Sequence, residues 1–176
     1  MKLAVFFLSV LIASPVMAAE APFVWPDCYT HKTLETNKTD KTLHFVNTFY
    51  ACGKYERNEN EKFGVSITRP DKGKEYTIAK DGSVSVRREL PANYGKDLDG
   101  KTWTLLGEET INGKSALKYK IDYHVEGKPH ERIFWLSADK KTPLRFEDGD
   151  SIVEYTNYSA GKQDPKLFEV PGISQE

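Results

Sequence analysis

Large apolar residues and polar residues alternate along the segment 117–125, where every odd position is Leu, Tyr, Ile or Val. Successive side chains of a β-strand point to opposite faces of a sheet, so this alternation predicts a strand with one dry face and one wet face. Other segments show the same pattern less regularly, and the chain has almost no long amphipathic helix to cover their dry faces. Such a sheet must curl over itself as a barrel, half-barrel or sandwich.

Runs rich in Val, Ile, Thr, Tyr and Phe predict strands throughout the chain. The predicted strands are Leu43–Arg57, Phe63–Arg69, Glu75–Ala79, Ser83–Glu89, Thr102–Thr110, Ser115–Val125, Glu131–Ser137, Leu144–Glu147 and Ser151–Tyr158, with an earlier one around Tyr29–Thr36. Turn sequences separate them at 70–74, 80–83, 112–114, 126–129 and 148–150. Asn-Gly and Asp-Gly favour tight hairpins, so we expect consecutive strands to pair antiparallel in a meander.

Helical segments are few and short in this prediction. The interval Pro91–Gly100 has room for one or two helical turns, although Gly95 lies in its middle. The fold class that we expect is therefore all-β to α+β: a strongly curved antiparallel sheet that forms an incomplete β-barrel, with few short helices.

The first 18 residues are typical of a secretory signal peptide, because Lys2 precedes an apolar run at 3–13 and small residues stand at Val16 and Ala18. Residues 19–176 then form one domain, which is long enough for a real core. Later segments fall short of the roughly 18 apolar residues of a transmembrane helix. We expect export to the periplasm and no transmembrane segment in the mature chain.

The two cysteines, Cys28 and Cys52, both lie in the expected mature chain. An exported protein meets an oxidising compartment, so a disulfide between them is the expected state and a reactive or metal-binding pair is the alternative. A bridge over a loop of about 25 residues contributes on the order of 3 kcal/mol in the chain-entropy model.

Charge and motifs argue against nucleic-acid binding and against catalysis. Without the signal peptide, 24 basic residues face 26 acidic ones, and no strong basic patch is present. His124, His130 and Glu131 flank one turn, where exposed side chains are a better interpretation than metal ligands. Glu108 and Glu109 point to opposite faces of a strand and are poorly placed as an acid and base pair. We expect no enzymatic activity, no metal and no cofactor.

Aromatic residues make up 12% of the chain, and several stand inside the predicted strands. An apolar cavity suited to an acyl chain is one interpretation of their placement, and a packed core is the other. The candidate ligand-binding residues are Phe45, Phe49, Tyr119, Ile121, Tyr123 and Trp135.

A series of short motifs runs through the second half of the chain. Gly107 and Glu108 end a strand, Asn112 and Gly113 form a turn, and Lys118 and Tyr119 follow on the next strand. The series continues with Trp135, the Pro-Leu-Arg run at 143–145 and a closing Leu-Phe-x-x-Pro segment at 167–171. In order and spacing this series resembles bacterial exported proteins related to the LolA/LolB lipoprotein-carrier superfamily, over roughly residues 54–173.

The resemblance implies an incomplete barrel whose concave apolar face receives acyl chains or related lipid moieties. The chain departs from the LolA carriers in lacking long helices that would plug the mouth of the barrel. Two functions follow as expectations. One is a periplasmic binding or carrier protein for a lipid or a lipoprotein acyl chain, and the other is a non-enzymatic scaffold with a filled core that binds an envelope protein.

Overall fold

The computed structural model describes residues 21–91, 101–125 and 127–173. Eleven strands make up nearly all of its regular structure: β1 Cys28–Asn37, β2 Leu43–Cys52, β3 Tyr55–Asn60, β4 Gly64–Arg69, β5 Lys74–Ile78, β6 Val84–Glu89, β7 Thr102–Ile111, β8 Lys114–Val125, β9 Lys128–Ser137, β10 Pro143–Asp148 and β11 Ser151–Ala160. Two short 3-10 helices, η1 Pro70–Lys72 and η2 Pro165–Phe168, complete the described part. The helical turns predicted within 91–100 fall on residues 92–100, which lie outside the described residues.

The predicted strands are found close to their expected positions, with one correction. Leu43–Arg57, predicted as one strand, is two strands, because the chain reverses at Gly53 between Cys52 and Tyr55. Gly53 has φ +58, a left-handed conformation that glycine adopts without steric cost. A Gly-Lys pair inside a long run of strand-forming residues is a weak turn signal, so the sequence did not predict this turn.

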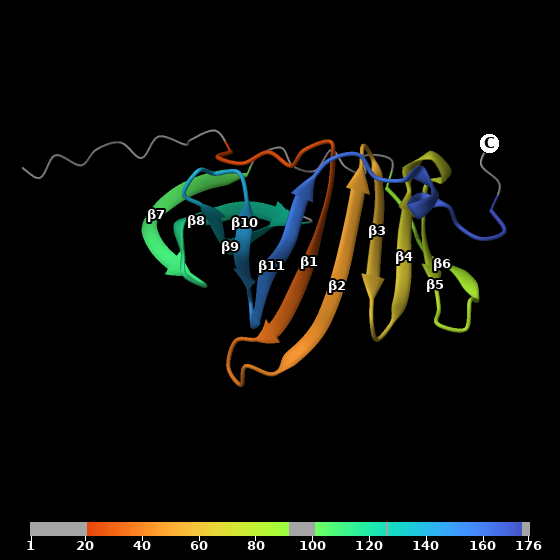
Figure 1. The fold of residues 1–176 in the computed structure, drawn as a ribbon, viewed down its shortest axis with the longest axis horizontal. Helices are drawn as coiled ribbons and strands as arrows, with labels where there is room; N and C mark the ends of the chain where they lie inside the picture. Colours follow the sequence, from red (N-terminus) through yellow and green to blue (C-terminus); the bar gives the residue numbers. More distant parts are fainter. Residues whose placement is uncertain (1–20, 92–100, 126, 174–176) are drawn as a thin grey trace, which may run out of the picture.

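All eleven strands belong to a single open antiparallel sheet with the order β6-β5-β4-β3-β2-β1-β11-β10-β9-β8-β7. Consecutive strands pair with each other, except that β6 and β7 do not pair and form the two edges of the sheet. The last strand, β11, returns to pair with β1. The sheet is strongly curved, with β7 and β8 coiling round one end while β2 to β6 run side by side at the other (Figure 1). The expected fold class is confirmed.

Strand register divides the side chains between two faces. The face that we call the aromatic face carries, across neighbouring strands, Phe49, His31, Tyr155, Phe146, Phe134 and Tyr119. Rings two strands apart meet on it: the centroid of Phe134 lies 5.7 Å from that of Trp103 and 6.1 Å from that of Tyr155. The backbones of such strands are roughly 9.5 Å apart in a flat sheet. We infer that the aromatic face is the inner side of the curl.

The core of the β7–β11 half is packed on both faces. On the aromatic face, Leu117, Tyr119, Ile121, Phe134 and Leu136 form one buried cluster. On the opposite face, Ile111, Ala116, Trp135 and Leu144 form a second cluster. Each fully buried Leu, Ile or Phe side chain stabilises the fold by about 1.5–3 kcal/mol, so these clusters supply much of the driving force for folding.

The C-terminal segment covers the opposite face of the β3–β5 half. Phe168 and Val170 are buried, and Val170 packs with Ile67 and Tyr76 in a third cluster. The guanidinium of Arg57 donates to the carbonyl of Leu167 over 3.0 Å, which ties the segment to β3. The closing Leu-Phe-x-x-Pro motif therefore takes the role that a covering helix has in other folds.

Cys28 and Cys52 stand directly opposite each other on β1 and β2 and form the expected disulfide. Because β1 is the middle strand of the sheet, the bridge ties β2 to the strand that pairs with both β2 and β11. The N-terminal segment 21–27 leads directly into this bridged position.

Candidate functional site

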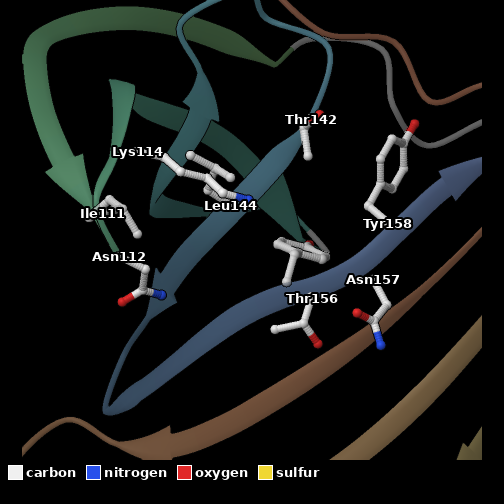
Figure 2. Close-up of a pocket in the computed structure, with 9 residues that line it drawn as sticks. Ile111, Asn112, Lys114, Thr142, Leu144, Thr156, Asn157 and Tyr158 are labelled. Carbon is white, nitrogen blue, oxygen red and sulfur yellow. The ribbon is translucent and has the colours of Figure 1, made fainter.

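A cavity of about 510 Å³ opens where β10 and β11 separate. The two strands pair from Arg145 and Glu154 to Asp148 and Ser151, and beyond Arg145 they diverge. The lining residues are Ile111, Asn112, Lys114, Thr142, Leu144, Tyr155, Thr156, Asn157 and Tyr158. Figure 2 shows Ile111 and Asn112 on one side of this β10–β11 cavity and Thr142 and Tyr158 on the other. Its volume is within the range of sites for small ligands.

A β-bulge in β11 lies close to this separation. The pairing of β11 with β1 shifts by one residue between Thr30 and Lys32, and Asn157 at the shift has φ +52. Asn tolerates this left-handed conformation better than most residues. Bulges bend a strand and change the direction of its side chains, so this one alters the course of β11 beyond its last pair with β10.

A second cavity, of about 490 Å³, adjoins the first under the N-terminal segment. Its lining includes Phe23 and Val24 of that segment, and it shares Thr142 and Tyr158 with the β10–β11 cavity. Figure 1 shows the N-terminal segment, in orange-red, running across the ends of the strands on this side of the sheet. Because the two cavities share these lining residues, we describe them together as the β10–β11 site.

Ring contacts hold the N-terminal segment on the aromatic face. The ring of Trp25 stacks on that of Tyr29 with centroids 4.6 Å apart, and Phe23 meets Trp25 edge-on at 5.0 Å. Aromatic pairs of this geometry add about 0.5–1.5 kcal/mol beyond their buried area. These contacts position the apolar wall that Phe23 and Val24 give to the site.

His31 is the buried titratable residue beneath this segment. Its ring lies among Trp25, Tyr29, Phe49 and Tyr155, at centroid distances of 5.0 to 5.8 Å. Burial among these uncharged rings disfavours the imidazolium and lowers the pKa of His31 to about 4. His31 is therefore a neutral ring within this aromatic cluster at physiological pH.

The pKa of His31 predicts a loss of stability in mild acid. The unfolded chain takes up this proton near pH 6.5 and the folded one only near pH 4, so the unfolded state binds more protons between these values. We expect the free energy of unfolding to fall from pH 6.5 to pH 4 by up to about 1.4 kcal/mol per pH unit from this residue. Urea titrations across this range should show a smaller slope for His31→Phe than for the wild type; equal slopes would contradict the assignment.

Tyr155 connects the β10–β11 cavity with the packed core. It lines the cavity and also contacts the rings of His31, Phe134 and Phe146. Burial raises the pKa of its hydroxyl far above the ordinary value, and the nearby cation Arg132 offsets only part of that rise. The hydroxyl thus stays protonated and is able to donate a hydrogen bond to a bound molecule.

The predicted ligand-binding residues are not gathered in one place. Tyr119 and Ile121 are only 4% and 6% exposed within the packed cluster of the aromatic face, and Tyr123 packs at its edge. Phe49 stacks on His31, and Phe45 lines a different cavity on β2–β5.

Trp135 lies on the opposite face from Tyr119. Its indole packs with Ile111 and Leu144, donates to the carboxylate of Glu109 over 3.1 Å, and has the ammonium of Lys118 over its ring. The register pairs Phe134, and not Trp135, with Tyr119. Adjacent residues of a strand point to opposite faces. The sheet therefore separates the cluster that contains Trp135 from the cluster that contains Phe134.

The lining of the β10–β11 site was missed by sequence reasoning. Ile111, Leu144 and Tyr158 are ordinary strand residues in the sequence, and the N-terminal segment has no strand pattern. One signal was present: Asn157 interrupts the run of β-formers in β11, and Asn is depleted within regular strands. A bulge at that position could have been proposed, but not the cavity that it opens.

The described residues show no arrangement suited to a metal. No group of three or more His, Cys, Asp and Glu side chains in these ranges lies close enough to hold an ion. His130 stacks on Tyr123 with ring centroids 5.6 Å apart, and the neighbouring Glu131 points to the other face of β9. Glu108 and Glu109 pair with Leu117 and Ala116 and so also occupy opposite faces.

Within residues 21–91, 101–125 and 127–173, no helix has the length and apolar character needed to cross a membrane.

The fold is similar to that of the lipoprotein LppX from Mycobacterium tuberculosis, with a TM-score of 0.51 and 11% sequence identity over 78% of this chain and 89% of that one. Weaker similarity extends to a LolA-superfamily protein from Nitrosomonas europaea (TM-score 0.43, 10% identity, 84% and 92% of the two chains) and to LprF from Mycobacterium bovis (0.42, 11%, 78% and 89%). No protein-family model and no curated protein matches the sequence. At 11% identity the similarity to LppX concerns the fold alone.

Proposed function

We propose that this protein is an exported, periplasmic carrier that holds the acyl chain of a lipid or lipoprotein in the β10–β11 site. The observation that carries the proposal is the pair of adjoining cavities, of about 510 and 490 Å³, which share Thr142 and Tyr158. The curved-sheet scaffold shared with LppX supports it. The proposal moves the ligand from Tyr119 and Ile121, where the sequence suggested it, to the gap between β10 and β11.

The lining suits a molecule with an apolar chain and a polar end. Tyr158 is half-buried and offers ring surface, whereas Ile111 and Leu144 are 8% and 7% exposed and contribute only their outer atoms. Each methylene that a ligand buries against apolar surface contributes about 0.8 kcal/mol. Asn112 and Lys114 stand at one end of the cavity, where an amide and an ammonium can meet a carboxylate or ester group. A carrier of this kind needs no catalytic residue.

Filling the shared part of the site should abolish binding. Thr142→Trp places an indole where the two cavities meet, and we expect it to weaken the binding of a dansyl-labelled undecanoic acid at least tenfold, measured by fluorescence titration. Thr39→Trp is the matched control, since Thr39 is exposed in the turn between β1 and β2. Saturable binding that both variants retain would contradict the location of the site.

Export is tested separately by the mass of the protein recovered from the periplasm. We expect an intact mass that corresponds to a chain beginning at Ala19, because the first 18 residues have the signal-peptide pattern. A full-length chain that stays in the cytoplasm would contradict the periplasmic assignment and leave the acyl-binding experiment unaffected.

The alternative function, a scaffold for an envelope protein, is favoured by one feature of the edge strand β7. Leu105 and Leu106 are 56% and 50% exposed at a register shift of β7, an edge strand that pairs with β8 alone among the described strands. Exposed edge strands are able to accept a further strand from a partner. A wild-type protein that binds no dansyl-labelled fatty acid would favour this alternative over the carrier.

A further inference from the structure

The aromatic face becomes polar where it crosses β2 to β5. Register places Asn58, Ser66 and Thr77 in one row across β3, β4 and β5. Asn47 and Asn60 form the neighbouring row on β2 and β3. A cavity of about 420 Å³ lies over these rows, lined by Glu35, Phe45, Asn47, Asn58, Asn60, Phe63, Gly64, Val65, Ser66, Thr77 and Arg87. We call it the asparagine cavity.

Asn58 has an unsatisfied group in this cavity. Its side-chain oxygen Oδ1 is buried and makes no hydrogen bond with any described residue. A buried polar atom without a partner costs about 1–3 kcal/mol, so most such atoms in folded proteins are paired with protein or with ordered water. An oxygen in this position is an acceptor that a ligand hydroxyl would satisfy.

The two other asparagines are held in place by the protein. Asn60 Nδ2 donates to Asn47 Oδ1 over 2.7 Å, and Asn60 Oδ1 accepts from the backbone N–H groups of Lys62 and Phe63 at 2.8 and 2.9 Å. Asn47 Nδ2 in turn donates to the hydroxyl of Thr33 over 3.4 Å. These bonds fix the amides before any ligand arrives, which lowers the entropy cost of binding.

The charges of the lining favour a neutral ligand. The cavity has one acidic and one basic side chain, Glu35 and Arg87, and each already has a partner. Arg87 Nη1 pairs with Glu75 Oε1 at 2.8 Å, and Glu35 Oε1 accepts from the hydroxyl of Ser151 at 2.8 Å. The remaining polar lining consists of amides and hydroxyls, which are both donors and acceptors.

Aromatic rings form the other wall. Phe45 and Phe63 lie with ring centroids 5.4 Å apart, and Phe63 is 59% exposed. The negative face of such a ring attracts positively polarised groups: it holds the ammonium of Lys62 5.3 Å from the centroid of Phe63, and it also attracts the C–H bonds of a molecule that lies flat upon it. A ring that carries hydroxyls on its edge and C–H bonds on its face matches both walls of the cavity.

We propose that the asparagine cavity binds a neutral, hydroxyl-rich ligand, a sugar or a polyol, through Asn58 and the ring of Phe63. The site is separate from the β10–β11 site, with which it shares no lining residue. The test of this proposal is therefore independent of the test of the acyl-carrier proposal.

The test follows the side-chain amide signals of the asparagines in a ¹H–¹⁵N NMR titration with N-acetylglucosamine, glucose and glycerol, and with sodium acetate as the charged comparison. We expect at least one of the three neutral probes to shift the Asn58 signal saturably, and acetate to leave it in place. Asn58→Leu and Phe63→Ala should each weaken the binding of that probe at least fivefold. Leu43→Ala is the matched control, because Leu43 is equally exposed, at 58%, and does not line this cavity.

Thermal unfolding checks that the variants are folded. Asn58→Leu should unfold at the same temperature as the wild type or a few degrees higher, because it removes an unpaired buried oxygen. The proposal is overturned if none of the neutral probes shifts the asparagine signals, if acetate binds as strongly as they do, or if the folded Asn58→Leu and Phe63→Ala variants bind like the Leu43→Ala control.

Discussion

Replacing Phe134 with alanine is expected to lower the free energy of unfolding by about 3 to 5 kcal/mol, the range for deleting a buried aromatic ring. Phe134 is 6% exposed and belongs to the cluster with Tyr119 and Leu136. Its ring also contacts Trp103 on β7 and Tyr155 on β11, and each of these strands lies two positions from β9 in the sheet. Removing the ring therefore leaves a void among side chains of β7, β9 and β11 that pack together on the aromatic face.

Urea denaturation followed by tryptophan fluorescence measures this loss directly. Leu105→Ala on the edge strand is the control, since a side chain that is 56% exposed should change the free energy by no more than about 0.5 kcal/mol. A Phe134→Ala variant no less stable than Leu105→Ala would mean that the aromatic face is not closely packed at this point.

Removing the disulfide is expected to cost about 3 to 4 kcal/mol in the double variant Cys28→Ser, Cys52→Ser. The two cysteines are 24 residues apart, and opening a loop of this length restores conformational entropy to the unfolded chain. The effect on the fold should be concentrated at β1 and β2, because the bridge joins their paired ends.

The control for this second experiment is chemical. Wild-type protein denatured in the presence of a reductant should match the double variant, whereas the oxidised wild type should require more urea. Identical midpoints for the oxidised wild type and the double variant would show that the bridge contributes nothing to stability under these conditions.

Close packing of the aromatic face limits which residues are suitable for tests of ligand binding. Tyr119 and Ile121 are core residues, so a charged substitution at either would unfold the protein and remove any activity without locating a site. Thr142 is a better target because it lines both cavities of the β10–β11 site and is only partly buried.

Local pattern was sufficient for most of the fold. The alternation from Leu117 to Val125 is a strand of the sheet, and the turn at Asn112 and Gly113 joins β7 and β8 with positive φ at both residues, as a type I′ hairpin requires. With only two cysteines in the chain, the disulfide pairing followed as well. The strand and the turn depend on residues that are close in sequence, and two cysteines allow one intramolecular pairing.

The sequence-based prediction groups Tyr119 and Trp135 in one cavity wall, whereas the structure places them in clusters on opposite faces of the sheet. Phe134 and Trp135 are neighbours, so only one of them is able to face Tyr119. Which one does so depends on the register between β8 and β9, and a shift of one residue would exchange them. Turn sequences locate a hairpin but did not fix this register.

Local residue pattern specifies a helix-poor, curved antiparallel sheet, the position of most of its strands and the bridge between Cys28 and Cys52. The place where the sheet opens depends on long-range contacts. The β10–β11 site depends on pairing between β1 and β11, whose residues Tyr29 and Ala160 lie far apart in the chain, and on the bulge at Asn157 that interrupts this pairing. A cavity formed by such long-range contacts leaves no periodic pattern in the residues that line it, because each of them also obeys the alternation of its own strand.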